Sequence, residues 1–315
     1  MSKQIKNGKA FEYACLDIIS KKYKDSVVII KEENKAYKTA EKYYNELESE
    51  HKSILKDGSK IGIDIVERLE PNLMSFLSTD KLILSIQTDA KGQTGDVRDV
   101  LINKNNKWEI GISSKHNHEA VKHSRLSPTI DFGKKWLNIE CSDNYFNEIN
   151  SVFNQLIKLK GIKWKETNIN KSKIVYKPLL DAFKKEMMNL YEKYGEEVPK
   201  RLVKYLIGKH DFYKFILEVE KRFLKVNAYN ISGALNRRTK NIKSEYNLPK
   251  INLPTKIYHF DFLENKDNTL ELSCNNGWQI SFRIHNASSK IETSMKFDVM
   301  LIGVPVDIPT FIGII

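Results

Sequence analysis

The chain has 315 residues, 41% of them hydrophobic, and its 52 Lys and Arg residues exceed its 40 Asp and Glu residues to give a formal net charge of +12. This length can bury one large core or two modest ones, and the ordinary apolar content excludes a disordered chain. The basic excess favours a polyanionic partner such as nucleic acid. Many lysines stand beside Asn and Ile, however, a composition that AT-rich genomes also produce.

The three cysteines, Cys15, Cys141 and Cys274, lie far apart and form no CxxC pair. This pattern excludes a disulfide framework and a zinc-finger spacing, and it favours a reducing, bacterial cytoplasm. The first residues contain no apolar segment typical of a signal peptide. Acidic and proline residues interrupt the apolar stretch Phe297–Ile315, so we expect a buried strand and tail there and no membrane contact.

The first ninety residues are predicted to be mainly helical. The expected helices combine apolar residues at helical spacing with charged outer faces, and they cover Gly8–Tyr23, Tyr37–Leu55 and Ile61–Leu69. Two short apolar runs, Val27–Lys31 and Lys81–Thr88, are expected to be strands. Together with the hairpin described below, these segments predict a small sheet flanked by helices, an α/β core.

After Pro128 the chain is predicted to be helical first and β-rich later. Helical spacing covers Asn144–Lys160, Lys177–Tyr194, Pro199–Ile207 and Asp211–Lys225. The basic segment Arg237–Lys250 has no strong apolar period and is expected to be a loop or linker. Strands are expected at Ile257–Phe262, Thr269–Ser273, Trp278–Ile284 and Lys296–Ile302.

The most informative segment is a predicted hairpin whose turn lies at Asn103–Asn106. Side chains of a strand alternate between two faces. The core-facing side chains of the second strand are then Trp108, Ile110 and Ile112. The opposite face carries Glu109, Gly111, Ser113 and Lys115. This second row packs poorly in a core, but it allows a metal ion and a phosphodiester to approach the backbone.

The first strand of the hairpin carries two aspartates on opposite faces, so one of them is expected to reach a metal ion. Asp99 directly precedes an apolar strand, which favours it, and Asp96 follows a glycine in a tight register with Ser113. Both aspartates stay candidates. Carboxylates suit Mg²⁺, a hard ion that requires oxygen ligands. Lys115 can orient the attacking water and stabilise the charge on the phosphorus.

A basic segment follows the hairpin. Its candidates for DNA contact are His116, Asn117, His118, Lys122, His123 and Arg125. If Asn117–Leu126 is helical, His118, Lys122 and Arg125 fall on one face and can hold the phosphates of the scissile strand. The histidines also raise the possibility of zinc, but no cysteine pair or suitably spaced carboxylate completes such a site.

At these residues the sequence resembles the PD-(D/E)xK nuclease superfamily. Asp99 or Asp96 matches its aspartate, and Ser113-Ser114-Lys115 stands at its (D/E)xK position, with serine in place of the usual acid. The resemblance implies that another carboxylate supplies the missing metal ligand. The candidates are Glu109 on the same face, Glu119 in the following segment, and Glu12, which matches a first-helix glutamate of many of these nucleases.

Two longer blocks are similar to the HaeIII family of type II restriction endonucleases. The first contains Gly-Asp-Val-Arg-Asp-Val at 95–100, Glu-Ile-Gly-Ile-Ser-Ser-Lys-His-Asn-His at 109–118 and Lys-His-Ser-Arg-Leu-Ser at 122–127. The second covers 277–289 and 295–299. This resemblance implies Mg²⁺-dependent cleavage of double-stranded DNA, with GGCC as the expected target.

The second block also has a chemical interpretation of its own. Its polar side chains cluster at a strand end: Arg283, His285, Asn286 and Ser288. Arginine pairs bidentately with guanine O6 and N7, and the other side chains can make further groove contacts. A polar turn that closes a hairpin would explain the same residues equally well. Arg237 and Arg238 are expected to bind phosphates without sequence specificity.

The sequence therefore predicts an α/β protein with a restriction-endonuclease-like mixed sheet flanked by helices. A PD-(D/E)xK-like nuclease core is expected at 1–140, and a helical, then β-rich DNA-recognition region at 141–315. The expected function is a type II restriction endonuclease, monomeric or homodimeric, with Mg²⁺ as cofactor, double-stranded DNA as substrate and a cognate DNA methyltransferase encoded nearby. The alternatives are a structure-specific repair or recombination nuclease, and a non-catalytic DNA-binding module suggested by the missing acid at Ser113.

Overall fold

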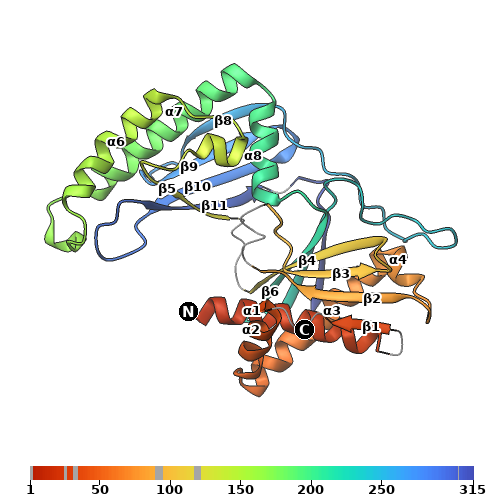
Figure 1. The fold of residues 1–315 in the computed structure, drawn as a ribbon. Coiled ribbons are helices and arrows are strands. Elements are labelled where there is room, and N and C mark those ends of the chain that lie inside the picture. The colour runs from red at the N-terminus through yellow and green to blue at the C-terminus, as the bar shows by residue number, and fades with distance from the viewer. Residues whose placement is uncertain (1–2, 25–26, 31–34, 89–94, 117–121, 304) are drawn as a thin grey trace. The chain divides into compact units, whose positions relative to one another are not determined.

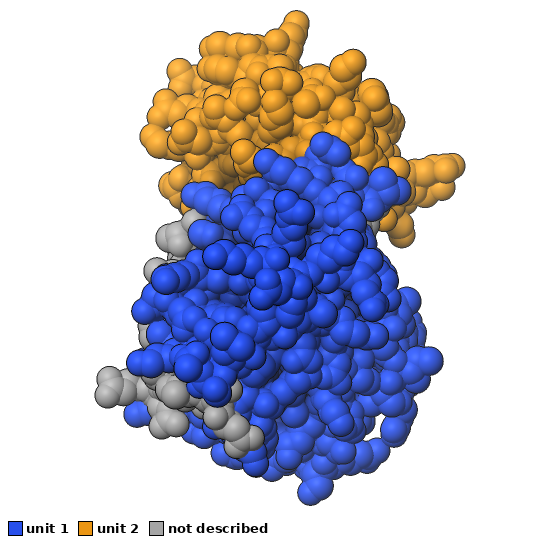
Figure 2. Space-filling model, turned by 90° about the vertical axis from the view of Figure 1, so that its right-hand side faces the viewer, with its two compact units in different colours: residues 1–119, 208–252, 306–315 blue, residues 120–207, 253–305 orange. Residues whose placement is uncertain are grey.

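The computed structural model describes residues 3–24, 27–30, 35–88, 95–116, 122–303 and 305–315, with only the backbone at 27–30 and 122–123. The chain forms two compact units (Figures 1 and 2). The first comprises residues 1–119, 208–252 and 306–315, and the second comprises residues 120–207 and 253–305. The chain thus does not divide once near residue 140, as the sequence suggested, but returns twice to the first unit.

A seven-stranded mixed sheet organises the first unit, in the order β1-β2-β3-β4-β6-β7-β12. Its strands are β1 (Val27–Ile30), β2 (Lys81–Ile86), β3 (Val100–Lys104), β4 (Trp108–His116), β6 (Phe212–Glu218), β7 (Phe223–Tyr229) and β12 (Thr310–Ile314). The pairs β1/β2 and β4/β6 are parallel, and the other neighbouring pairs are antiparallel. Strands from both ends of the chain complete this sheet, which explains why its unit is discontinuous in sequence.

Helices of the first unit pack on the sheet (Figure 1). They are α1 (Lys3–Lys22), α2 (Lys35–Asn45), α3 (Ser49–Leu69) and the short α4 (Pro71–Met74). The predicted core face of β4 is confirmed, because Ile110 and Ile112 are fully buried and Trp108 packs against the same core. In α3, a Cβ added at Gly62 would lie 2.4 Å from the Phe215 ring, so glycine allows this helix to approach β6 closely.

A five-stranded antiparallel sheet organises the second unit, in the order β5-β11-β10-β9-β8. Its strands are β5 (Lys122–Leu126), β8 (Ile257–Phe262), β9 (Thr269–Cys274), β10 (Gln279–His285) and β11 (Met295–Gly303). Its helices are α6 (Asp143–Lys158), α7 (Lys177–Tyr194) and α8 (Glu197–Ile207). They lie on one face of this sheet (Figure 1), where the Phe183 ring is centred 5.4 Å from Phe282 and 5.0 Å from Phe297. The remaining short helical turns are Gly133–Leu137, Trp164–Glu166, Ser172–Tyr176 and Asn275–Gly277.

The α/β class is confirmed, but three helix predictions are wrong. Residues 211–225 form the β6–β7 hairpin, because β6 is buried on both faces and shows no alternation that would distinguish it from a helix. Residues 122–126 form β5, which pairs with the distant β11, and residues 117–121 lie outside the described part. The expected helix Tyr37–Leu55 is divided between α2 and α3.

The end of the chain also differs from its prediction. β11 is a strand as expected, but β12 is an edge strand paired only with β7 among the strands described. Ile312 and Ile314 on β12 are 65% and 84% exposed, whereas Phe311 and Ile315 are partly buried against the core, so this tail is buried on one side only. In the part of the chain that the structure describes, no helix has the length and apolarity needed to cross a membrane.

Candidate active site

Asp99 is held by the backbone of two neighbouring strands. Its amide nitrogen donates to the carbonyl oxygen of Ile112 in β4, at 2.8 Å, and its carbonyl oxygen accepts from the Gln87 amide after β2, at 2.8 Å. Asp99 therefore continues the sheet at the start of β3, although β3 itself begins at Val100. The sheet, rather than a flexible loop, positions this carboxylate.

The Asp99 carboxylate gathers the hairpin residues that the sequence singled out. Its Oδ2 atom accepts from Ser113 Oγ at 3.2 Å, from the Ser114 amide at 2.8 Å and from Lys115 Nζ at 3.1 Å. Ser113 is buried, and Lys115 is about one-third exposed. An aspartate, a serine and a lysine thus meet around one oxygen, at the residues that resemble the (D/E)xK motif in the sequence.

Glu12 of α1 is the second carboxylate of this site. Its side chain is buried, and Lys9 Nζ lies 3.1 Å from it. Burial, followed by the negative charge of Asp99, raises the pKa of Glu12 to about 8, against the opposing charges of Lys9 and Lys115. Glu12 thus interacts electrostatically with both Asp99 and Lys115, which keeps it a candidate for the same site.

The donor atoms around Asp99 fit a divalent cation. Glu12 and Asp99 offer carboxylates and Ser113 offers a hydroxyl, all hard oxygen ligands of the kind that Mg²⁺ prefers. Among the residues described, no group of three or more His, Cys, Asp or Glu side chains is placed to hold a metal ion. Mg²⁺ commonly keeps several of its waters, so two carboxylates would suffice as its acidic ligands.

Asp96, the alternative aspartate, has a different environment. Arg98 binds it in a bidentate manner, with Nε 2.8 Å from Oδ1 and Nη2 2.8 Å from Oδ2, and Gln87 donates to Oδ2 at 2.9 Å. Burial alone would raise the pKa of Asp96, but the hydrogen bonds and charge of Arg98 lower it below its usual value. Asp96 is therefore an ion-paired carboxylate, and Asp99 is the aspartate that meets Ser113 and Lys115.

Glu109, expected to replace the missing acid at Ser113, also faces Arg98. Its Oε1 accepts from Arg98 Nη1 at 2.9 Å, and Asn103 Nδ2 lies 3.5 Å from Oε2. Glu109 lies on the predicted face of β4, the face that also carries Gly111. Its cross-strand partner, however, is Asn103, which lies two residues farther along β3 than the partner of Gly111. Of the candidate compensating acids, Glu12 interacts electrostatically with Asp99, and Glu119 lies outside the described residues.

His116 is placed differently from its predicted role in DNA contact. Its side chain is buried, and its Nε2 lies 3.2 Å from Nε2 of His51 in α3, with the two rings stacked. Burial and the proximity of His51 lower the pKa of His116 to about 4. A buried, neutral imidazole is unsuited to binding a DNA phosphate, so the structure argues against that role.

The other basic residues after the hairpin do not form a helical row. Arg125 lies in β5, where Nε donates to Ser294 Oγ at 2.9 Å and Nη2 lies 3.5 Å from Glu292. The backbone of Lys122 and His123 belongs to the same strand. Asn117 and His118 lie outside the described residues.

The C-terminal block lies on the second unit's sheet. Arg283 is exposed on β10, opposite Asp298 of β11, and His285 Nε2 lies 2.8 Å from the Asp298 carboxylate. Lys296 is the register partner of both His285 and Arg125. Arg125 and Arg283, far apart in sequence, thus belong to neighbouring regions of one sheet, an arrangement that depends on the β5–β11 pairing.

Two other predicted DNA contacts serve the turn after β10. Asn286 Oδ1 accepts from Tyr176 at 2.8 Å, its Nδ2 donates to the Ser288 carbonyl at 2.6 Å, and Ser288 Oγ accepts from the Lys290 amide at 3.0 Å. This geometry supports the alternative that these residues close a polar turn. Arg237 and Arg238 are exposed, and Arg237 donates to the Gly233 carbonyl at 2.8 Å.

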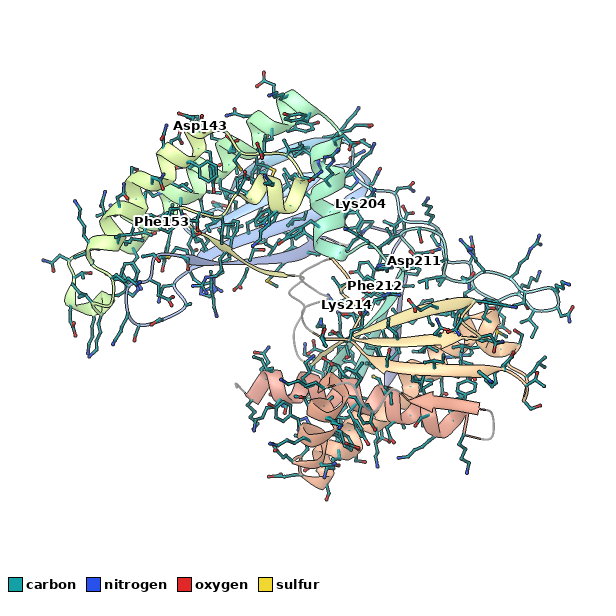
Figure 3. The ribbon with its side chains drawn as sticks, in the orientation of Figure 1. Asp143, Phe153, Lys204, Asp211, Phe212 and Lys214 are labelled. Carbon is teal, nitrogen blue, oxygen red and sulfur yellow. The ribbon has the colours of Figure 1, made fainter. Side chains whose placement is uncertain are left out.

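Residues near Asp99 that the sequence did not indicate are Arg98, Gln87 and Lys214. Lys214 of β6 (Figure 3) is the register partner of Ser113 and is largely buried. It could not be found from the sequence, because residues 211–225 were expected to be helical. Arg98 lies between the two candidate aspartates in the sequence. The only feature that could have indicated its role is its presence in the Gly-Asp-Val-Arg-Asp-Val motif.

An acidic pair with oxygen ligands beside a lysine is typical of enzymes that cleave phosphodiesters with a divalent ion. The family model described as HaeIII restriction endonuclease matches residues 8–305. The Type II restriction enzyme HaeIII of Haemophilus aegyptius is 43% identical over 305 residues, which cover 96% of this chain and 95% of that enzyme. The chain belongs to the HaeIII restriction endonuclease family, as its sequence motifs predicted, and its enzyme class is type II restriction endonuclease. No solved structure matches it.

Replacement of Glu12 by glutamine is expected to change the pH dependence of stability. The pKa of Glu12 rises from 4.5 to about 8 on folding, so the stabilisation from its protonated form is complete below pH 4.5 and is lost as pH rises through 8. Glutamine stays neutral. Between pH 4 and pH 9, the free energy of unfolding should therefore fall less in Glu12→Gln than in the unmodified protein. The difference between the two decreases should be on the order of a few kcal/mol. Urea unfolding in EDTA measures this, and an identical pH dependence in both proteins would contradict the environment assigned to Glu12.

Proposed function

We propose that the protein makes Mg²⁺-dependent double-strand cuts in DNA at GGCC. The observation that carries the proposal is the meeting of Asp99, Ser113 and Lys115 around one carboxylate oxygen, in a chain of the HaeIII family. The similarity to the HaeIII enzyme supports GGCC as the target. A cytoplasmic bacterial setting and a DNA methyltransferase encoded nearby, which would protect the host sites, belong to the same proposal.

Each residue of the site has a role in this reaction. Glu12 and Asp99 would hold the Mg²⁺ ion, which lowers the pKa of a bound water and neutralises charge on the phosphate. Lys115 Nζ, held 3.1 Å from Asp99 Oδ2, is placed to orient the attacking water and to stabilise the developing negative charge. Ser113 fixes the Asp99 carboxylate by a hydrogen bond and adds a weak oxygen ligand. Glu12 thereby supplies the acid that the (D/E)xK position lacks.

DNA recognition is assigned to the second unit. Arg283 is an exposed arginine on β10 that can pair with guanine O6 and N7 in the major groove, as a target made only of G and C requires. His285 and Asp298 lie beside it, and Arg125 and Lys122 would bind phosphates from β5. Arg237 and Arg238 of the first unit are exposed and would add salt-dependent affinity for the backbone.

A cleavage assay on phage DNA tests the proposal. Purified protein with Mg²⁺ is expected to give discrete fragments whose sequenced ends all derive from GGCC, and EDTA is expected to abolish cutting. If the ends share a different palindrome, the assigned target is refuted, but the restriction activity is still supported. A preference for branched or damaged substrates would favour a repair nuclease instead. Binding without cleavage at any Mg²⁺ concentration would favour a non-catalytic DNA-binding module.

A further inference from the structure

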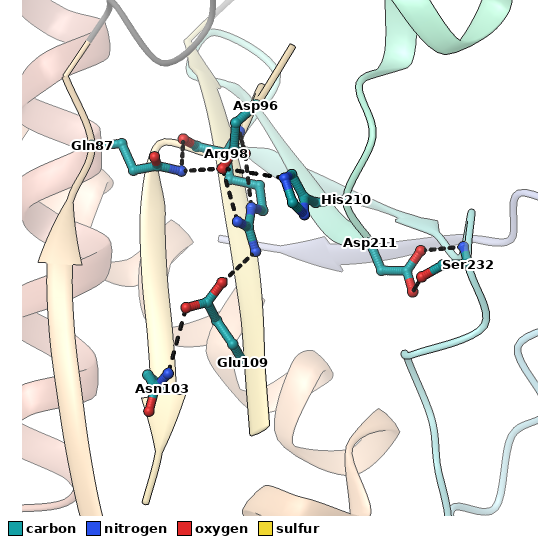
Figure 4. Close-up of polar contacts among 8 residues, drawn as sticks. All are labelled: Gln87, Asp96, Arg98, Asn103, Glu109, His210, Asp211 and Ser232. Atoms are coloured by element: carbon teal, nitrogen blue, oxygen red, sulfur yellow. Dashed lines mark hydrogen bonds and ion pairs between the residues drawn. The ribbon is translucent and has the colours of Figure 1, made fainter. Parts of the chain in front are cut away.

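The buried Arg98 is the centre of an ionic cluster next to the candidate active site (Figure 4). Its side chain is 7% exposed, and its guanidinium donates two hydrogen bonds to Asp96 and one to Glu109, all between 2.8 and 2.9 Å. A buried guanidinium is costly unless its donors are matched, and a bidentate carboxylate is the strongest match available. The cluster therefore defines the conformation of residues 96–98 closely.

This cluster is joined to the backbone on either side of Asp99. Asp96 Oδ1 also accepts from the Arg98 amide at 3.2 Å, which closes a tight turn in the chain just before Asp99. The Gln87 side chain donates to Asp96 at 2.9 Å and to the Arg98 carbonyl at 3.1 Å, while the Gln87 amide donates to the Asp99 carbonyl at 2.8 Å. One glutamine after β2 thus connects the ionic cluster to the residue that bears the metal-binding carboxylate.

Gly111 of β4 makes room for Arg98. A Cβ built at Gly111 would lie 2.2 Å from Cδ, 2.5 Å from Cγ and 2.7 Å from Cβ of Arg98, so the aliphatic part of the arginine rests directly on the glycine backbone. Gly111 is two positions before Ser113 on the same face of β4. Glycine in the motif is therefore explained by the close approach of Arg98, not by the approach of substrate.

We propose that Arg98 is a positioning residue that acts on the metal ion through Asp99. Together with Asp96, Glu109 and Gln87, Arg98 fixes the backbone before β3. The Asp99 carboxylate is thereby kept in hydrogen-bonding distance of Ser113, Ser114 and Lys115. This inference rests on the proposed function, because it assumes that Asp99 binds the catalytic divalent ion. Asp96 and Glu109, which the sequence offered as metal ligands, are then partners of Arg98 and do not bind the metal ion themselves.

The test compares Arg98→Lys with the unmodified protein. Lysine keeps the positive charge but cannot form the two-pronged bond to Asp96. Partners behind a metal ligand typically change metal affinity or activity by 10–100-fold. The variant is expected to bind Mn²⁺ at least about tenfold more weakly, measured by calorimetry without DNA, and to show a kcat lower by a similar factor with an unchanged KM. Excess Mn²⁺ should restore part of kcat, an effect that a general loss of structure would not give.

Two further variants keep the test decisive. Gln87→Met removes the connecting hydrogen bonds without leaving a buried charge unpaired. It should also weaken Mn²⁺ binding, and it replaces Arg98→Lys as the test if that variant does not fold. Arg68→Lys, at an exposed arginine of α3, is the matched control and should leave Mn²⁺ binding and kcat unchanged. Mn²⁺ affinity within twofold of the unmodified protein in folded Arg98→Lys would overturn the proposal, as would a raised KM with unchanged kcat. Absence of cleavage by the unmodified protein would instead refute the proposed function.

Discussion

Lys115→Ala is expected to reduce single-turnover cleavage of a GGCC duplex by at least about 10³-fold while DNA binding is retained. The ammonium lies 3.1 Å from Asp99 Oδ2, so it is fixed where an attacking water and the phosphate oxygens would converge. A positioned general acid or base contributes typically about 10²–10⁴-fold, and a fixed charge beside the developing oxyanion contributes a comparable factor. Rates are measured by quenched-flow with excess enzyme, and binding by gel shift in Ca²⁺.

The matched control for this variant is Lys134→Ala, which removes an exposed lysine that pairs only with the exposed Glu140 among the described contacts. Its cleavage rate should stay within about twofold of the unmodified protein, because exposed ion pairs contribute little. Cleavage by Lys115→Ala at an undiminished rate would show that Lys115 does not take part in the chemistry. An equal loss in both variants would point to a general effect of charge.

Asp99→Asn is expected to be as damaging as the loss of Lys115, and more damaging than Asp96→Asn. The amide can still accept the bonds from Ser113 and Ser114, so the local structure should persist, but the charge that binds a divalent ion is gone. We expect a loss of about 10³-fold or more in cleavage and weak Mn²⁺ binding. Asp96→Asn, which weakens the ion pair with Arg98 and the hydrogen bond from Gln87, should lose about 10–100-fold.

Comparison of the two variants resolves the choice between the aspartates that the sequence left open. Circular dichroism and thermal melting establish that each variant is folded before its activity is compared. If Asp96→Asn were inactive and unable to bind Mn²⁺ while Asp99→Asn kept both properties, the assignment of the metal site would be reversed.

The sequence predicted the β3–β4 hairpin and the strands of the C-terminal region well, because alternating burial and turn residues are local signals. It failed at β6, since a strand buried on both faces has no alternation and looks like a helix. It failed at β5 for a different reason. That strand exists because β11, which is distant in sequence, pairs with it, and no local pattern reports such a partner.

The candidate site was predicted in part for related reasons. Ser113 and Lys115 lie on one face of β4, which strand periodicity predicted, whereas the same reasoning left open which of Asp96 and Asp99 meets them. Glu12 is on a helix, and its electrostatic interaction with Asp99 depends on how α1 packs on the sheet, so only the family resemblance indicated it. Arg98 was missed because an arginine among acidic residues is usually solvated, whereas here the space above Gly111 buries it.

The absence of an acid at Ser113 is consistent with this arrangement. A serine hydroxyl removes one negative charge from a site that already holds Glu12 and Asp99 close together. Burial and the charge of Asp99 raise the pKa of Glu12 to about 8, so a third carboxylate would increase the repulsion further. A divalent ion relieves this repulsion, and its binding should therefore release a proton from Glu12 near neutral pH.

Anomalous diffraction from a crystal of the protein grown with Mn²⁺ is the most direct test of the account. The Asp99 and Glu12 carboxylates are the ligands assigned to the metal ion, with Lys115 beside it. We predict one strong peak within about 2.0–2.3 Å of an oxygen of each carboxylate, with Asp96 and Glu109 still bound to Arg98. A peak on Asp96 and Glu109, with Arg98 displaced, would contradict the account.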